Sequence, residues 1–234
     1  MQIKKPYAFG ALLVFGAGLA YAADQTILGN QLLVKNPSTP DKRKVVGKGK
    51  ESASPNTIVG NPTVTGGVLV VNATGTSPTA QIFLLPPTIS GITGKPFWSG
   101  DAVKGFKYKD SKGENGAVKV AQIKKSASGT FSVKTVVVGK LGPVNVLPPN
   151  VGTGGCVLLG IIGGDTYSLQ FGATSLITDK GATLFKAKKP TVEGTCVTTT
   201  TSSSTTTTTS STTTTTLYGS PSRAFVDHVM GLLD

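Results

Sequence analysis

GFKYKDSKGENGAVKVAQIKKSASGTFSVKTVVVG, residues 105–139, is the stretch in which the sequence most clearly specifies a structure. Its apolar residues recur at every second position, with Phe106 and Tyr108 separated by a lysine. This period of two is typical of strands with one buried face. Two short segments rich in Gly, Ser and Asp, residues 110–113 and 126–129, favour chain reversal. The stretch therefore predicts a three-stranded antiparallel meander with apolar side chains inside and lysines in water.

Working outward, the first 22 residues predict a signal peptide rather than part of the fold. Lys4 and Lys5 precede an apolar run, residues 9–19, and Ala20-Tyr21-Ala22 fits a cleavage site with small residues at both ends. The apolar run is too short to span a bilayer comfortably. An uncleaved N-terminal anchor is the alternative, and no later run predicts a transmembrane span. We therefore expect an exported protein, secreted or held at the cell surface.

Residues 23–197 predict one all-β domain, an antiparallel two-sheet sandwich. This region is rich in Gly, Pro, Val, Thr and Lys, and lacks the apolar periodicity of helices. About ten or eleven short strands separated by turn residues are enough for a single sandwich with a substantial core. Segments 32–36, 66–70 and 82–87 resemble segments 106–110, 128–133 and 144–149 in the same order. The similarity suggests two diverged four-strand units, with chance similarity between strands as the alternative.

Two cysteines, Cys156 and Cys196, lie in the part of the chain that is expected to be exported. In an oxidising compartment their expected state is a disulfide, which would stabilise the fold by roughly 4 kcal/mol in the chain-entropy model. A metal site is the alternative, but the only histidine, His228, is far along the chain. The sequence thus predicts a disulfide, with no metal and no cofactor.

The net charge is strongly positive and is carried by lysine. It is +12 for the whole chain and falls to +10 without Lys4 and Lys5, while Arg43 and Arg223 are the only arginines. Sites that recognise phosphate and nucleic acid favour the bidentate arginine fork, so we expect no nucleic-acid partner. Solvated strand faces that resist edge-to-edge aggregation would explain the lysines. Loose binding to a cell-surface or extracellular polyanion is the alternative.

No catalytic pattern emerges from the sequence, and we expect a protein that is not an enzyme. Nucleophile elbows, zinc-ligand sets, phosphate loops and haem-attachment motifs are missing. The loop DSKGENG, residues 110–116, predicts a turn rather than a calcium site. Aromatic rings could stack on a sugar, or they could instead close one end of the core. The candidate glycan contacts are Phe97, Trp98, Tyr108, Lys107 and Lys109.

Beyond the β domain, residues 198–216 contain only Thr and Ser and predict a disordered linker or stalk. Fully extended, this tract would reach up to about 60 Å. Residues 217–234 then predict a short amphipathic helix, because Phe225, Val229 and Leu232 recur at helical spacing. We expect this tail, Leu217–Asp234, to meet a secretion or anchoring partner or to mediate self-association, unless it is simply a frayed end.

The GFKYKD segment, followed by a lysine-rich valine strand and by GTFSVK at residues 129–134, resembles an uncharacterised family of exported, lysine-rich bacterial β-domain proteins. The resemblance covers residues 100–150 best. It implies export and a β fold, and it carries no activity. The expected function is therefore a structural or adhesive role at the cell surface, with binding of an anionic glycan or other polyanion through the lysine-rich strands as the alternative.

Overall fold

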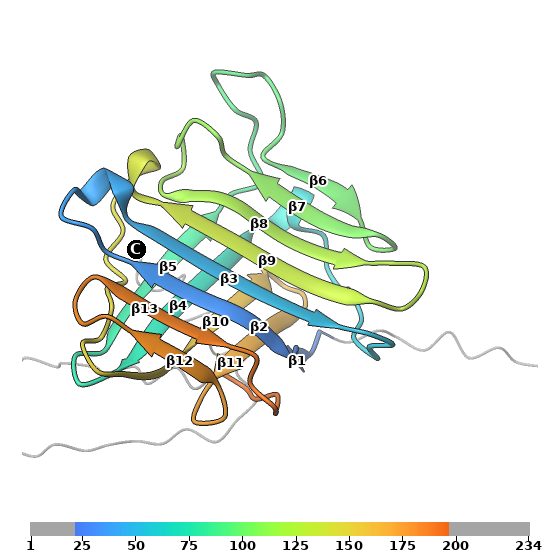
Figure 1. Cartoon of the computed structure of the whole chain (residues 1–234). Helices are drawn as coiled ribbons and strands as arrows, with labels where there is room; N and C mark the ends of the chain where they lie inside the picture. Colours follow the sequence, from blue (N-terminus) through green and yellow to red (C-terminus); the bar gives the residue numbers. More distant parts are fainter. Residues whose placement is uncertain (1–21, 197–234) are drawn as a thin grey trace, which may run out of the picture.

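The computed structural model describes residues 22–196, which form a β-sandwich of two sheets. An eight-stranded sheet lies in front of a five-stranded sheet in Figure 1, and the strands of the two sheets run in crossing directions. The predicted all-β sandwich is therefore confirmed. The predicted signal peptide, the Thr/Ser tract and the tail fall outside the described residues, apart from Ala22. Among residues 22–196, no helix has the length and apolar character needed to cross a membrane.

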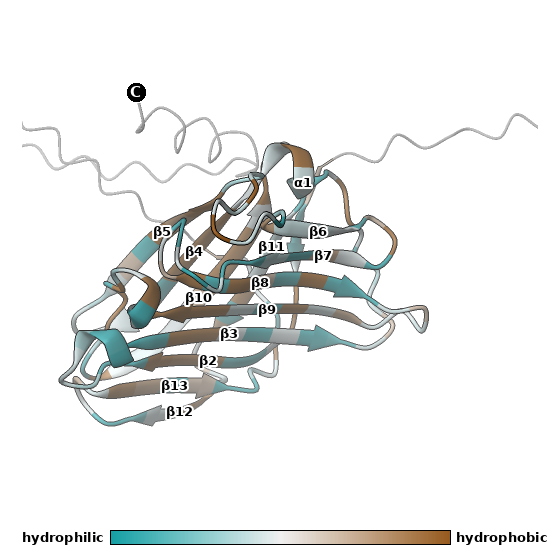
Figure 2. Cartoon of the chain, turned by 90° about the horizontal axis from the view of Figure 1, so that it is seen from above, coloured by the Kyte–Doolittle hydropathy of each residue, from teal (hydrophilic) through white to brown (hydrophobic). Residues whose placement is uncertain are grey.

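The eight-stranded sheet is antiparallel throughout and has the order β12-β13-β2-β3-β9-β8-β7-β6. Figure 2 shows these strands side by side in this order, with β12 at one edge and β6 at the other. The strands are β2 (Gly29–Lys35), β3 (Lys44–Glu51), β6 (Trp98–Asp101), β7 (Gly105–Lys109), β8 (Val118–Lys125), β9 (Phe131–Val138), β12 (Leu176–Asp179) and β13 (Leu184–Lys188).

The five-stranded sheet has the order β1-β11-β10-β4-β5. Its strands are β1 (Asp24–Thr26), β4 (Gly67–Gly75), β5 (Thr79–Leu85), β10 (Gly152–Ile161) and β11 (Thr166–Phe171). The first strand, β1, pairs parallel with β11, whereas the other neighbours are antiparallel. The part of the chain that the structure describes also contains three short helical turns: α1 (Pro62–Thr65), η1 (Pro40–Lys42) and η2 (Gly139–Leu141).

The predicted meander is present as β7, β8 and β9, which are adjacent and antiparallel. The turn between β7 and β8 is organised by Asp110, as its sequence predicts. One carboxylate oxygen of Asp110 accepts from the backbone N–H groups of Lys112 and Gly113, at 3.1 and 2.7 Å, and the other accepts from Asn115 at 2.8 Å. Backbone donors of its own loop thus satisfy this carboxylate, which is the arrangement of an Asx turn rather than of a cation site.

The core fills the space between the sheets with apolar side chains from both. Its largest fully buried members include Leu32, Phe131 and Phe185 from one sheet and Leu159 and Tyr167 from the other. Glycine brings the sheets close together at the centre of β3. A Cβ atom on Gly47 would lie 2.7 Å from Thr135 Oγ1 and 2.8 Å from a methyl carbon of Val157 on the opposite sheet. The absence of a side chain at Gly47 therefore permits the close approach of β3 and β10.

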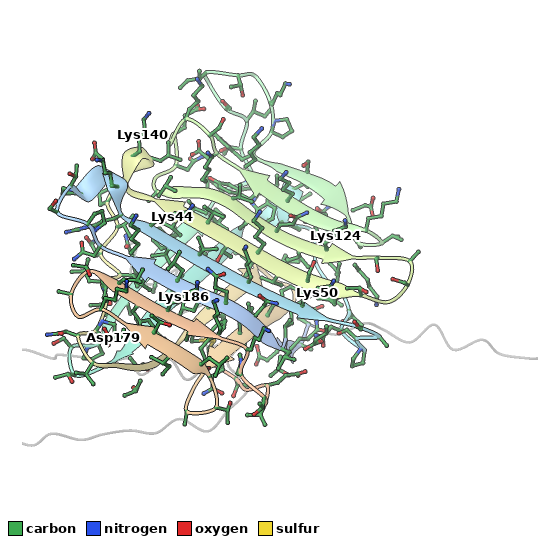
Figure 3. The ribbon with its side chains drawn as sticks, viewed as in Figure 1. Lys44, Lys50, Lys124, Lys140, Asp179 and Lys186 are labelled. Atoms are coloured by element: carbon green, nitrogen blue, oxygen red, sulfur yellow. A yellow bond between two sulfur atoms is a disulfide. The ribbon has the colours of Figure 1, made fainter. Side chains whose placement is uncertain are left out.

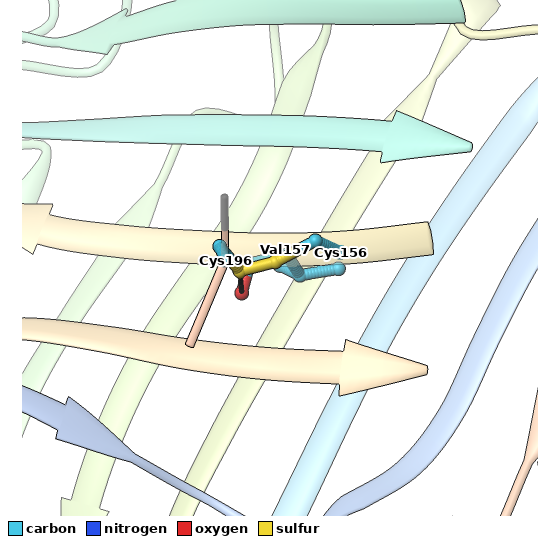
Figure 4. The surroundings of a disulfide bond; sticks show 3 residues. All are labelled: Cys156, Val157 and Cys196. Atoms are coloured by element: carbon cyan, nitrogen blue, oxygen red, sulfur yellow. Dashed lines mark hydrogen bonds between the residues drawn. A yellow bond between two sulfur atoms is a disulfide. The ribbon is translucent and has the colours of Figure 1, made fainter. Parts of the chain in front are cut away.

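Cys156 and Cys196 form the predicted disulfide, shown in Figure 4, with Cα atoms 5.7 Å apart. Cys156 lies on β10, and the bond encloses β11, β12 and β13, which all follow it in the sequence. Cys196 packs against a small apolar cluster of Val68, Val70 and Leu158. The disulfide therefore fastens the end of the described chain to the five-stranded sheet.

The two segments that resemble each other in sequence do not fold as equivalent units, which corrects the suggestion of two four-strand units. The first segment is divided, because β2 and β3 lie in one sheet while β4 and β5 lie in the other. In contrast, β7, β8 and β9 stay together in one sheet, and residues 144–149 form no strand. The shared pattern reflects the common demands of half-buried strands and the turns between them.

Candidate functional site

The outer face of the eight-stranded sheet carries most of the lysines on the strands, and we call it the lysine face. Alternation places one set of side chains in the core and the other in solvent, as in β7, where Phe106 and Tyr108 are buried and the intervening lysine is exposed. The lysine face is made by Lys35, Lys44, Lys48, Lys50, Lys107, Lys109, Lys124, Lys134, Lys186 and Lys188. Figure 3 labels Lys44, Lys50, Lys124 and Lys186 on this sheet.

Strand register assembles part of the lysine face into a row that crosses six strands. From β13 to β7 the paired residues are Lys188, Gln31, Lys48, Lys134, Gln122 and Lys107. Neighbouring strands lie about 4.8 Å apart, so the row spans about 24 Å. Every side chain in it is a hydrogen-bond donor. Such a row can present positive charge and amide groups to an extended anionic surface.

The lysine face concentrates like charge at a cost in stability. Lys48 pairs directly with Lys134, and Lys35 pairs directly with Lys44. Like charges opposite each other on neighbouring strands are destabilising. None of the outward positions on β2, β3, β7, β8, β9 and β13, all within residues 22–196, is acidic. On these six strands the lysines therefore have no carboxylate neighbour. On the edge strand β6, Asp101 shares the outward side with Ser99, the partner of Lys107, but its Oδ1 accepts from the backbone N–H groups of Val103 and Lys104.

Lys186 and Lys188 lie close together on the outer side of β13. A hydrogen bond with Lys188, the next outward residue on β13, lowers the pKa of Lys186, with smaller effects from desolvation and from the positive charge of Lys188. An anion bound at this point would favour the charged form of both side chains. Electrostatics therefore favours a negatively charged ligand here.

Beside the row of Lys and Gln residues, the lysine face also presents four apolar side chains on adjacent strands, which are Leu33, Val46, Val136 and Val120. Val46 is only 6% exposed although it points away from the core, so side chains around it cover the strip. Lysine stems can lie along apolar surface while their ammonium groups stay in water. The lysine face is thus an apolar strip bordered by cations, rather than an aqueous layer of polar residues.

An open cleft of about 440 Å³ lies where the lysine face meets the loop before β6. Lys107 and Lys109 line one side, and Lys95 and Lys112 also contribute. The two acidic residues that line it, Asp110 and Glu114, are engaged within the loops. Asp110 accepts from backbone N–H groups of its own turn, and the Glu114 carboxylate accepts from Ser90 Oγ and from the backbone N–H of Gly91 at 2.7 Å. The cleft therefore offers mainly ammonium groups to an incoming ligand.

The aromatic members of the candidate glycan site are not available to a ligand, which corrects that part of the prediction. Phe97, Trp98 and Tyr108 are 4%, 2% and 1% exposed. Trp98 Nε1 donates to the backbone oxygen of Leu85 at 2.9 Å, and both Phe97 and Trp98 pack on the Tyr108 ring. The rings close one end of the core, as the structural interpretation of the Phe-Trp pair expects. Only Lys107 and Lys109 from the candidate set face solvent.

Sequence reasoning missed most of the lysine face. It singled out Lys107 and Lys109, but not Lys48, Lys134 or Lys188, which join them through pairing between strands distant in sequence. Alternation of Lys with Gly or Val in residues 44–50 was a signal that these lysines share one face. Which of these lysines become neighbours depends on the order of the strands in the sheet.

Comparisons with known proteins leave the fold and the lysine face as the only guides to function: no family model, no curated protein and no solved structure matches the chain. The resemblance to exported lysine-rich β-domain proteins therefore stays a prediction.

Proposed function

We propose that this protein is an exported, non-catalytic β-sandwich that adheres to a polyanionic surface through the lysine face. The observation that carries the proposal is the row of Lys and Gln residues that crosses six strands with no acidic residue in it. An extended anionic polysaccharide at a cell surface matches this shape, because it can contact several ammonium groups in succession. Lysine offers no bidentate fork, so binding would depend on charge density more than on sugar identity.

A purely structural role is the second candidate, and the burial of the three aromatic rings favours it. Under this interpretation the lysines keep the broad face of the sheet soluble and prevent association between copies. The two candidates differ in one measurable respect. A structural lysine face can be neutralised without losing a ligand, whereas an adhesive lysine face cannot.

The test is binding of the purified β domain to an immobilised sulfated polysaccharide, used as a polyanion probe. A variant carrying Lys48→Gln, Lys134→Gln and Lys107→Gln removes three charges from the lysine face. Its matched control carries Lys42→Gln, Lys140→Gln and Lys180→Gln, three exposed lysines outside the strands of the lysine face. Each lysine near an anionic surface contributes about 1 kcal/mol, so the first variant should bind about a hundredfold more weakly at low salt.

The control variant should keep most of the affinity, although its net charge is the same. Binding of the parent protein should vanish near 1 M salt, where the screening length is about 3 Å. Equal losses in the two variants would mean that total charge, rather than the lysine face, attracts the polyanion. Retention of full binding by the lysine-face variant would leave the structural role as the better account.

A further inference from the structure

Asp165 is a completely buried carboxylate whose hydrogen-bond partners include no cation. It lies in the turn between β10 and β11 and is 0% exposed. Its Oδ2 atom accepts from the backbone N–H of Val59 at 2.7 Å and from Thr57 Oγ1 at 3.1 Å. Buried carboxylates are rare without a positive partner, because removing a charge from water costs several kcal/mol. With the Tyr167 hydroxyl 3.5 Å from Oδ2, Asp165 has hydrogen-bond donors but no positive charge among them.

The other carboxylate oxygen of Asp165 contacts the residue that directly follows the expected cleavage site. Asp165 Oδ1 accepts from the backbone nitrogen of Ala23 at 2.9 Å. Ala23 is the residue that follows the expected cleavage site Ala20-Tyr21-Ala22. In the uncut chain this nitrogen is a neutral amide with one proton, whereas in a chain cut after Ala22 it is an ammonium with three.

Several contacts hold Ala23 in place independently of Asp165. The carbonyl oxygen of Ala23 accepts from the backbone N–H of Thr166 at 2.9 Å. The next residues, β1, pair in parallel with β11, and the Gln25 side chain both donates to and accepts from the backbone of Thr57. The nitrogen of Ala23 is thus fixed in front of the carboxylate by the fold itself.

We propose that the Ala22–Ala23 bond is a processing site and that Asp165 is the receptor for the new N-terminus. An export peptidase would add water across this peptide bond, leaving a carboxylate on Ala22 and an amine on Ala23. The amine takes up a proton and becomes the cation that Asp165 lacks. Ala22 and Ala23 are both exposed, so the bond is accessible.

The geometry distinguishes cleavage at the Ala22–Ala23 bond from cleavage at the peptide bonds on either side of it. One residue of extended chain spans about 3.3 Å, so cleavage one residue earlier or later would move the ammonium out of hydrogen-bond distance from Oδ1. Processing at the Ala22–Ala23 bond would therefore stabilise the mature fold specifically. The interaction does not depend on the lysine face, and the proposed function can fail without affecting it.

The first experiment compares two choices of first residue, each with and without the Asp165 carboxylate. The chain through Asp234 is prepared with Ala23 or with Ala22 as its first residue, each in the parent sequence and with Asp165→Asn. In the parent sequence the Ala23 form should melt about 5 °C or more above the Ala22 form, because only its ammonium meets a buried charge. With Asp165→Asn that difference should disappear, whereas with the control Asp24→Asn it should persist. A difference that survives Asp165→Asn would overturn the proposal.

The second measurement needs no substitution and so remains informative if Asp165→Asn prevents folding. An amine-selective reagent that favours N-termini is reacted with the Ala23 form and with the Ala22 form at neutral pH. The ion-paired α-amine of the Ala23 form should react about tenfold or more slowly, which corresponds to about 1.4 kcal/mol of protection. Equal rates would show that Asp165 does not hold the N-terminus. Mass spectrometry of the exported protein should find Ala23 first, and any other start would contradict the proposed cleavage.

Discussion

At the scale of single residues, Tyr108 links the packing of the aromatic cluster to a measurable ionisation. Burial, assisted by the negative charges of Asp110 and Glu114, raises the pKa of Tyr108 to about 12, against a hydrogen bond with Asn115 that lowers it. Burial and the charge of Asp165 likewise raise the pKa of Tyr167. Both phenols thus stay neutral in the folded protein at pH values where the unfolded chain would lose protons. This is the expected behaviour of rings that close a core and do not face a ligand.

We predict that this ionisation makes the fold sensitive to alkaline pH. Tyrosine in the unfolded chain loses its proton near pH 10, and Tyr108 in the folded protein loses it near pH 12. Between these values the unfolded state binds fewer protons, so the free energy of unfolding falls as pH rises. Melting temperatures measured across this range should fall more steeply for the parent than for Tyr108→Phe, each relative to its own value at neutral pH. Parallel curves would show that Tyr108 does not titrate with unfolding.

At the scale of the secondary-structure elements, close contact between β3 and β10 explains why a strand in the middle of a sheet contains glycine. Glycine weakens a strand, since it has no side chain to pack and loses more backbone entropy. Here the missing side chain gives space to Val157 from the opposite sheet and to Thr135 on β9. Gly47 therefore weakens β3 locally but allows the two sheets to pack closely.

We predict that Gly47→Ala destabilises the protein by about 1–3 kcal/mol through overpacking. The control is Gly172→Ala, because a Cβ atom at Gly172 would meet no other heavy atom within 4 Å. Urea unfolding of both variants measures the difference, and the control should stay within about 0.5 kcal/mol of the parent. A Gly47→Ala protein as stable as the control would mean that the sheets separate easily to admit a methyl group.

At the scale of the whole molecule, the fold and the lysine face both depend on pairings between segments distant in sequence. The fold depends on pairings across the entire described chain, since β1 meets β11 and β2 meets both β3 and β13. The lysine face likewise draws on strands from residue 31 to residue 188. The disulfide at Cys196 closes this unit. Every strand of the described residues pairs with another strand within residues 24–188, and residues 197–234 lie outside the described part of the chain.

We therefore predict that deleting residues 217–234 leaves the melting temperature of the β domain unchanged, within about 1 °C. The sequence of this segment predicts an apolar helical face, and a helix of about a dozen residues is marginal by itself in water. Its removal should instead change where the protein is located or whether it assembles, as measured by cell fractionation and by light scattering. Unchanged location and assembly would identify the segment as a chain end without a partner. A fall in melting temperature would mean that it packs on the sandwich.

The sequence by itself determined the class of fold, the central meander and the disulfide. These features depend on local information, namely the period of two around Tyr108, the turn residues near Asp110 and the presence of two cysteines in a chain that is expected to be exported. Local information was not enough for β6 and β12, which are four residues each, or for the separation of residues 24–35 into two strands in different sheets. Their pairing partners, rather than their own residues, make them strands.

Only the tertiary structure decided which way the aromatic rings face, which lysines share a surface and which donors reach Asp165. Each of these depends on contacts between segments distant in sequence, such as 142 residues between Ala23 and Asp165. A period of two shows that a strand has two faces, and it does not say which neighbour lies beside the strand or what covers it. The burial of a side chain and the gathering of lysines on one surface are properties of the assembled sheets, so they are decided only when every strand has its partner.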